Sequence, residues 1–435
     1  MKRFLRGSKR LGLVAMALFL AMALLLGSVV PAKAEPNERV VTTGILAAWT
    51  GALATETVPL HQGEVDHARW LNEQGGINGI NVKVLWEDWG SVAARALTVY
   101  RRLAEAGAVA ITCPVDLALD VAITRLIRDE IPAVYTSGST APQHVMRPVW
   151  IIGSGIEAEN IYLETLLWMK KKWKEQTTEK RKFRVAIFHA DMPIVNAVPD
   201  HIIPYINERT EELGVEVVGR EKAPFIGVVD TSVELLRLAA KKPDLIMVAH
   251  YGATMVVIVK DAARLDLPAK GIMFSADIAS LSDGIIRVAG KAAEGWYRNC
   301  DVTTMSDLGR PEAHMLPVIA DAAKRYRGIG RPEDVDLAYI KGWRANAVVT
   351  EAVRIAIEAV GYENLTGRAV RDGFLRIKDF DMGVGPPVSI SEERAYYGDT
   401  YFMQYVEKGE LVRVSEWWKC PERFHYLPGG KMVVR

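Results

Sequence analysis

Short apolar runs alternate with amphipathic stretches along the chain after its first 39 residues. The run 40–48 predicts a first strand, and residues 61–72 have helical spacing, with Val65, Ala68 and Leu71 on one face. The alternation continues with expected strands at 81–86, 108–113 and 133–136 and expected helices at 92–106 and 117–129. Strands and helices that alternate at this pitch predict right-handed crossovers and a parallel sheet covered by helices on both faces.

The pattern then restarts and predicts a second unit, as the length of 435 residues allows. Its expected elements are helices at 159–174, 199–213, 231–240 and 253–265 and strands at 183–189, 215–218, 244–249 and 271–275. Further helices are expected at 312–326, 336–360 and 368–377, and a β-hairpin at 401–406 and 410–417. We therefore predict an α/β protein with two doubly wound parallel-sheet lobes. Because ligands bind beyond the carboxyl ends of such strands, two facing sheets predict a shared cleft that closes about a hinge.

The first 34 residues differ in composition from the rest of the chain. They hold six basic residues and no acidic one, an apolar stretch at 11–26, and Pro-Ala-Lys-Ala at 31–34. This arrangement is typical of a secretory signal peptide, so we expect cleavage after Ala34 and a periplasmic mature protein. An uncleaved membrane anchor is the alternative. Without this segment the chain is mildly acidic, which gives no electrostatic reason to expect nucleic acid as a partner.

Three cysteines occur, and their spacing matches no zinc motif. If a disulfide forms in an oxidising compartment, we expect it between Cys300 and Cys420, and three unpaired thiols, with Cys113 buried, are the alternative. The sequence contains no P-loop, dinucleotide-binding fingerprint, nucleophile elbow or H-E-x-x-H motif. We therefore expect no cofactor, no metal and no enzymatic activity.

Four stretches of the sequence resemble motifs of a known family. They are Trp49–Gly51 with 68–79 (ARWLNEQGGING), 137–142 (SGSTAP), 244–252 with 261–264, and 271–277 with 292–295 (AAEG). In order and spacing they resemble the periplasmic leucine/isoleucine/valine-binding protein family, the type I solute receptors of ABC importers. The resemblance covers nearly all of the chain after residue 39.

This resemblance implies the type I periplasmic binding fold, in which a three-strand hinge joins the lobes. The crossovers are expected near Gly153, Asn299 and Phe380, with the C-terminal hairpin in the second lobe. The implied divisions are 1–34 for the signal peptide, 35–153 and 299–380 for the first lobe, and 154–298 and 381–435 for the second.

In the first lobe, Ser139 and Thr140 match the turn that holds a ligand carboxylate in the family through backbone N–H and hydroxyl donors. The alternative is a turn chosen for its geometry alone. Trp49 and Thr50 follow the first strand. There Trp49 either lines the site next to an apolar part of the ligand or packs between loops. Asp116 stands where relatives carry serines, and it either caps the next helix or faces the ligand, where it would repel a carboxylate.

In the second lobe, Tyr251 matches a family position that presents a side chain to the ligand. Asp277 lies close to the family's acidic partner for a ligand ammonium. Its alternative role is the N-cap of a helix expected at 278–289. Asp191, after the strand at 183–189, is a further candidate to reach the cleft.

From these features we expect a monomeric receptor of an ABC importer that delivers a small polar ligand, a branched-chain or other amino acid, to an inner-membrane permease. An amide, a urea-like compound or an aromatic acid is the alternative ligand, and a ligand-presenting sensor subunit is the alternative role. An enzyme would need a nucleophile or an acid–base pair in the cleft, and the sequence nominates none.

Overall fold

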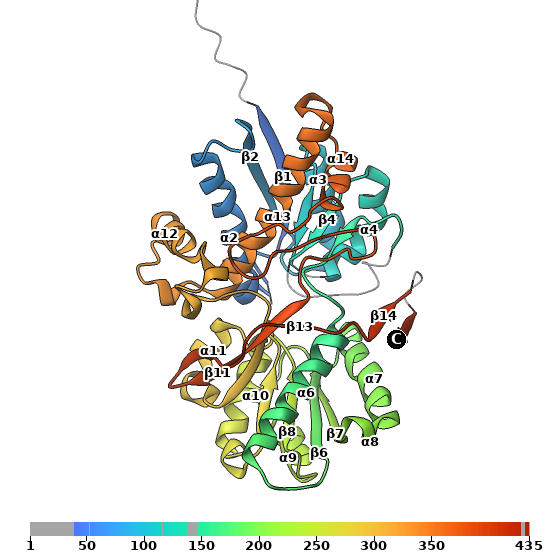
Figure 1. Cartoon of the computed structure of the whole chain (residues 1–435), viewed down its shortest axis with the longest axis vertical. Coiled ribbons are helices and arrows are strands. Elements are labelled where there is room, and N and C mark those ends of the chain that lie inside the picture. The colour runs from blue at the N-terminus through green and yellow to red at the C-terminus, as the bar shows by residue number, and fades with distance from the viewer. Residues whose placement is uncertain (1–38, 52, 115, 137–145, 428–430, 435) are drawn as a thin grey trace, which may run out of the picture. The chain divides into compact units, whose positions relative to one another are not determined.

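Two sheets organise the chain, which the computed structural model describes at residues 39–51, 53–114, 116–136, 146–427 and 431–434. The first sheet is parallel throughout and has the strand order β2-β1-β3-β4-β5 (Figure 1). Its strands are β1 (Val40–Ala47), β2 (Asn81–Asp88), β3 (Ile111–Cys113), β4 (Ala133–Tyr135) and β5 (Ile151–Ile152). The helices between them are α2 (Ala54–Glu73), α3 (Ala93–Glu105) and α4 (Asp116–Asp129).

The second sheet has the order β12-β11-β10-β9-β8-β6-β7, with β13 (Trp418–Lys419) beside β11. Its parallel strands are β6 (Phe183–Ala190), β7 (Val215–Ala223), β8 (Leu245–Ala249), β9 (Met273–Ala276) and β10 (Trp296–Cys300). The expected C-terminal hairpin, β11 (Thr400–Glu407) and β12 (Glu410–Arg413), is present and adds an antiparallel edge. A short hairpin of β14 (Phe424–Tyr426) and β15 (Met432–Val434) follows.

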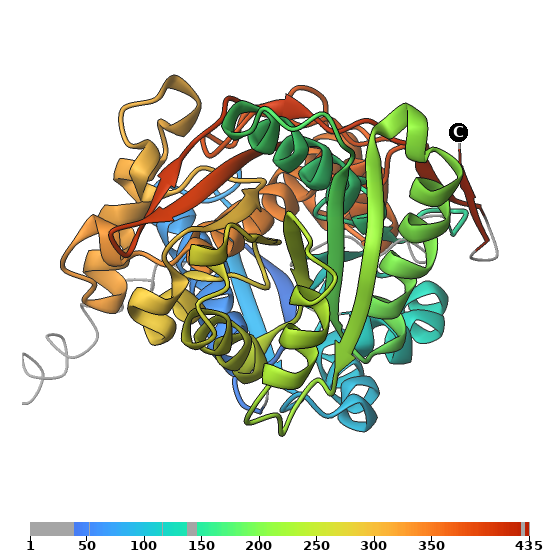
Figure 2. The same ribbon diagram turned by 90° about the horizontal axis from the view of Figure 1, so that it is seen from below.

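Helices cover both faces of the second sheet, as Figure 2 shows. The helices are α6 (Ala158–Gln176), α7 (Pro193–Glu208), α8 (Thr210–Leu213), α9 (Ser232–Ala239), α10 (Gly252–Arg264) and α11 (Asp283–Ala289). Side chains of a strand point alternately to its two faces. Val185 and Ile187 of β6 therefore pack with residues of α6 and α7, while Ala186 and Phe188 pack with residues of α9 and α10. The doubly wound parallel architecture predicted from the sequence is confirmed.

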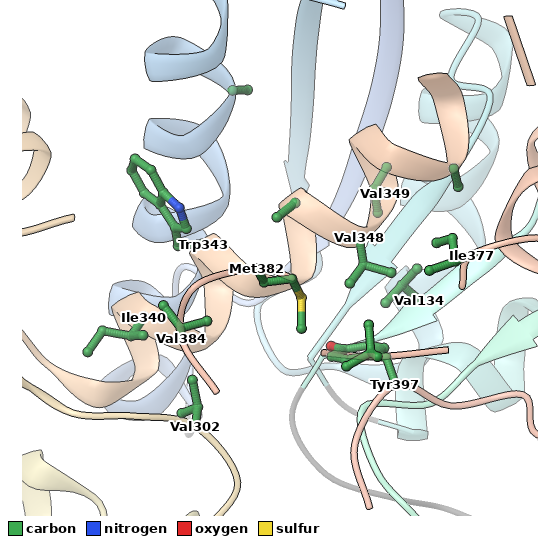
Figure 3. Close-up of a cluster of buried hydrophobic side chains, with 14 of the residues drawn as sticks. Val134, Val302, Ile340, Trp343, Val348, Val349, Ile377, Met382, Val384 and Tyr397 are labelled. Atoms are coloured by element: carbon green, nitrogen blue, oxygen red, sulfur yellow. The ribbon is translucent and has the colours of Figure 1, made fainter. Parts of the chain in front are cut away.

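After β10 the chain returns to the first sheet and forms α12 (Leu316–Arg327), α13 (Leu337–Val360) and α14 (Gly367–Phe374). Buried side chains of α13, among them Ile340, Trp343 and Val348, form a core with one face of the first sheet (Figure 3). The backbones of α2 and α13 approach closely, because a Cβ on Gly342 would lie 1.8 Å from the carbonyl oxygen of Leu60. Glycine is therefore required at this crossing.

The passages between the sheets run side by side near β5 and before β11. Gly153 forms an isolated bridge with Tyr396, and the N–H of Ile156 donates to the carbonyl of Gly398 at 3.0 Å. The segment after Phe380 still packs in the core of the first sheet, through Met382, Val384, Val388 and Ile390.

Four helix starts differ by four or more residues from the sequence-based expectation. Helix α7 begins at Pro193 instead of 199, and α12 begins at Leu316 instead of 312. Helix α2 begins at Ala54, not at His61, although Pro59 lies inside it. A proline in a helix interior removes a backbone hydrogen bond and usually marks a boundary, which explains the misplaced start. The helix expected at 278–289 begins only at Asp283, where the hydroxyl of Ser282 caps it by accepting from the N–H of Ile285.

The expected Cys300–Cys420 disulfide is wrong, because neither Cys300 nor Cys420 is part of a disulfide. Cys300 belongs to the core of the first sheet and Cys420 to a separate small cluster with Ile156 and Tyr401. Burial raises the pKa of the Cys300 thiol to about 12, so this side chain behaves as a small apolar group. None of the helices in the described part of the chain has the length and apolarity needed to cross a bilayer.

Candidate functional site

A carboxylate lies at the carboxyl end of β9, where a doubly wound sheet binds ligands. Asp277 follows β9 directly, and its Oδ1 accepts from the N–H groups of Ala279 and Ser280 at 2.8 and 2.6 Å. Its Oδ2 accepts from the hydroxyls of Tyr162 and Tyr251, the latter at 3.3 Å. Asp277 thus caps a turn with one oxygen and accepts hydrogen bonds from two tyrosines with the other. The N-cap role considered for a helix at 278–289 is replaced by this turn.

Three elements bring these side chains together. Tyr162 comes from the second turn of α6, and Tyr251 is the extended residue before α10. Gly252 follows with a φ of 62°, which turns the chain sharply into the helix. Burial, and then the charge of Asp277, raise the pKa of Tyr162 well above its usual range, so its hydroxyl stays protonated and donates.

The four acceptor positions of the Asp277 carboxylate are met by four donors. The bond from Tyr251 is the longest of them and is the easiest to exchange for another donor. A ligand ammonium has a full charge and three donors, so it would compete well for this position.

At the end of β1, Trp49 and Thr50 are held by Asp88 at the end of β2. The Asp88 carboxylate accepts from the N–H of Trp49 at 3.0 Å and from the hydroxyl of Thr50 at 2.6 Å. The Trp49 ring packs against His61 and Trp86, with centroids 5.4 and 5.3 Å away. This matches packing between loops, although the buried indole N–H has no hydrogen-bond partner among the described residues.

The remaining predicted residues are Asp191, Asp116, Ser139 and Thr140, and of these Asp191 lies apart from the cluster around Asp277. Asp191 is exposed and pairs with Lys222 at 3.1 Å, while Asp116 is the first residue of α4, so its predicted role stays a prediction. Ser139 and Thr140 lie outside the described residues. Within the described part of the chain, no group of three or more acidic, His or Cys side chains is placed to hold a metal ion.

A small cavity of about 40 Å³ lies between loops of the two sheets. Its lining comes from the start of α2, the loop after β9 and the start of α13, and it consists of Thr55, Glu56, Leu60, Ile278, Ala279, Ser282, Asp336, Leu337, Ala338 and Lys341. Both carboxylate oxygens of Glu56 are buried here without a hydrogen-bond partner in the described structure. Burial raises the pKa of Glu56 to about 7.

A charged pair beside this cavity also connects the two sheets. The fully buried Arg298 of β10 donates to Oδ1 of Asp283 at 2.7 Å, and Oδ2 of Asp283 accepts from the N–H of Leu337 at 2.8 Å. Sequence reasoning missed Tyr162, Glu56 and Asp283. Little in the sequence marked Glu56, which lies between the strand expected at 40–48 and the helix expected at 61–72.

A family model described as periplasmic binding protein matches residues 40–410. The chain belongs to the periplasmic binding protein family. Its predicted resemblance to the leucine/isoleucine/valine-binding receptors is confirmed at this level. No curated protein matches the sequence.

Several solved structures share the fold of this periplasmic binding protein at low identity. A branched-chain amino acid ABC transporter from Thermus thermophilus with bound valine has a TM-score of 0.74 and 18% identity, covering 88% of this chain and 97% of its own. A fatty acid ABC transporter substrate-binding protein from Thermomonospora curvata has a TM-score of 0.70 and 16% identity, with coverage of 88% and 93%. An R. palustris solute-binding protein in complex with benzoate has a TM-score of 0.67 and 16% identity, with coverage of 86% and 96%.

Family and fold agree with the geometry described above. This periplasmic binding protein is a solute-binding receptor, and its family implies a periplasmic location.

Proposed function

We propose that this periplasmic binding protein captures a small amine-bearing solute, an amino acid in the simplest case, and delivers it unchanged to an inner-membrane ABC permease. The observation that carries this proposal is the Asp277 carboxylate at the carboxyl end of β9, oriented by Tyr162 and Tyr251. A carboxylate shielded from water and paired with a cation gives a strong and orienting contact. The valine-bound relative supports an amino acid, while the fatty-acid and benzoate relatives keep other carboxylic acids as alternatives.

The proposed receptor consists of two lobes that close about a hinge. We assign residues 40–152 and 300–397 to the first lobe and residues 156–299 and 398–434 to the second. We place the last crossover between the lobes near residues 396–400 and not near Phe380, because Met382 and Ile390 pack in the core of the first sheet. Ser139 and Thr140 are proposed to hold the ligand carboxylate, and the mature monomer is proposed to begin at Glu35.

A thermal-shift screen of the mature protein against amino acids, amides and aromatic acids tests this function. A ligand that binds only the folded state raises the melting temperature, by an amount that grows with its concentration over Kd. We expect a shift with at least one amino acid and its loss in Asp277→Asn, while the exposed control Asp334→Asn keeps it. A shift with aromatic acids alone, unaffected by Asp277→Asn, would transfer the proposal to the aromatic-acid alternative.

A further inference from the structure

Glu56 lies where the two proposed lobes meet, on the first turn of α2. The loop after β9 in the second lobe and the start of α13 in the first lobe line the same cavity as Glu56. Thr55, its neighbour, has Cγ2 3.6 Å from the position that a Cβ on Gly284 would occupy, so α2 touches the second lobe here. The environment of Glu56 therefore depends on both lobes being together.

Among the residues that the structure describes, no cationic side chain pairs with the Glu56 carboxylate. Both of its oxygens are buried and lack a hydrogen-bond partner among the described residues. The N–H groups of Glu56 itself and of Gly252, in the second lobe, lie close enough to favour the charged form without reaching hydrogen-bond geometry. A buried carboxylate without a partner is costly when charged and much less so when protonated.

The other charged groups around the cavity are already committed to partners. From α13, Asp336 faces Glu56 with the same charge, and Lys341 lies 3.5 Å from Asp301. From the second lobe, Arg298 is paired with Asp283 at 2.7 Å, and Arg287 lies 3.8 Å from Asp336. These surroundings leave a proton as the simplest neutralising partner for Glu56.

We propose that closure of the two lobes takes up a proton on Glu56, so that acid favours the closed receptor; the inference rests on the hinge of the proposed function. Glu56 acts as a positioning residue, because it governs lobe closure without needing to touch the solute. Asp336 acts in the same direction, because burial and the neighbouring Asp283 of the second lobe raise its pKa while the lobes are together.

The direction of the pH dependence follows from the pKa of Glu56 in the two forms. Closure raises this pKa from an ordinary 4.5 to about 7. Below about pH 4.5 both forms hold the proton, so closure does not depend on pH. Between about pH 4.5 and pH 7 only the closed form holds the proton. Above pH 7 the closed form buries a charged carboxylate. The ratio of closed to open protein should fall by up to about tenfold per pH unit across this window.

The test measures lobe closure in the ligand-free mature protein, so its outcome does not depend on which solute is bound. Spin labels are attached to Arg101→Cys on α3 and Leu236→Cys on α9, which are exposed positions. The native Cys113, Cys300 and Cys420 are buried and therefore react slowly. Electron–electron distance distributions are recorded between pH 5 and 8.

In the wild-type protein we expect the shorter, closed distances to gain population as the pH falls from 7.5 to 5. Glu56→Gln resembles the protonated carboxyl and should keep the closed form populated above pH 7, with only the smaller pH response of Asp336 left, while the exposed control Glu333→Gln should follow the wild type. A wild-type distribution that does not change with pH overturns the inference, as does a Glu56→Gln variant that retains the full pH response. Loss of the amino acid thermal shift alone would instead count against the solute assignment and leave this result standing.

Discussion

Oδ2 of Asp283 accepts a hydrogen bond from the backbone N–H of Leu337 at 2.8 Å. Asp283 begins a helix of the second sheet, and Leu337 begins the long α13 that packs on the first sheet. The other oxygen of Asp283 accepts from the fully buried Arg298 at 2.7 Å. One carboxylate therefore neutralises a buried cation and connects the two halves of the molecule.

Replacing Asp283 with alanine should leave the guanidinium of Arg298 buried without its counter-charge. We expect a loss of about 3–5 kcal/mol in the free energy of unfolding, which is the usual effect of removing one partner of a buried pair. Urea denaturation followed by tryptophan fluorescence measures it. The control Asp321→Ala removes an exposed partner of Arg325 and should cost less than about 1 kcal/mol. Equal losses in the two variants would contradict the role given to Asp283.

The two tyrosines that meet Asp277 should contribute unequally to stability. Tyr162 is buried and makes the shorter bond, while Tyr251 donates over 3.3 Å. Because a hydrogen bond to a charged group contributes about 1.5–3 kcal/mol, Tyr162→Phe should lower the free energy of unfolding by an amount in that range. Tyr251→Phe should lower it by less than about 1 kcal/mol. Chemical denaturation of both variants in parallel decides the order, and the reverse order would show that Tyr251 is the main support of Asp277.

The crossing of α2 and α13 should not tolerate a side chain at Gly342. An added Cβ would lie 1.8 Å from the carbonyl oxygen of Leu60, a backbone atom that cannot move without shifting the helix. We expect Gly342→Ala to cost at least about 3 kcal/mol, at the upper end of the range for overpacking. The control Gly330→Ala meets nothing within 4 Å and should change stability by less than about 1 kcal/mol. Differential scanning calorimetry of both variants measures the contrast, and a stable Gly342→Ala protein would mean that the helices are farther apart.

Most of the fold was predictable from the sequence because burial leaves a direct signature there. The run Leu245–Ala249 is buried at every position, as a central strand of a parallel sheet must be. The C-terminal hairpin was predictable from the Lys408–Gly409 turn, where both residues have a positive φ. Helix starts were harder, because Pro59 hides the first turn of α2.

The site was less predictable than the fold because its contacts are distant in sequence. Asp277 and Tyr251 follow neighbouring strands, so their topology alone suggested that they lie together. Tyr162 comes from a helix and lies 115 positions from Asp277 in the chain. Nothing in an amphipathic pattern distinguishes it from an ordinary core tyrosine. Glu56 is similar, since the cavity around its buried carboxylate is lined by the start of α13 and the loop after β9, which are both distant in sequence.

A buried histidine in the first sheet's core should make the folded protein sensitive to acid. His67 is 4% exposed, contacts Asn346 through Nδ1 at 2.9 Å and packs edge-on against Trp343. Burial lowers the pKa of His67 from 6.5 to about 3. The folded state therefore holds His67 neutral, and the stability that this contributes is present above about pH 6.5 and is lost as the pH falls towards 3.

We expect the free energy of unfolding to fall by up to about 1.4 kcal/mol per pH unit below 6.5 through this one group. His67→Gln should lower the slope of the unfolding free energy against pH, measured by urea denaturation between pH 6.5 and 4.5, by the amount that corresponds to one proton. His314→Gln, at an exposed position, should leave this slope unchanged. An unchanged slope in His67→Gln would mean that other groups carry the acid response. Glu56 and Asp336 have raised pKa values in the folded protein, so they take up protons on folding and oppose the His67 effect in the same pH range. The His67 contribution is therefore obtained as the difference in slope between the wild-type protein and His67→Gln, in which the carboxyl contributions cancel.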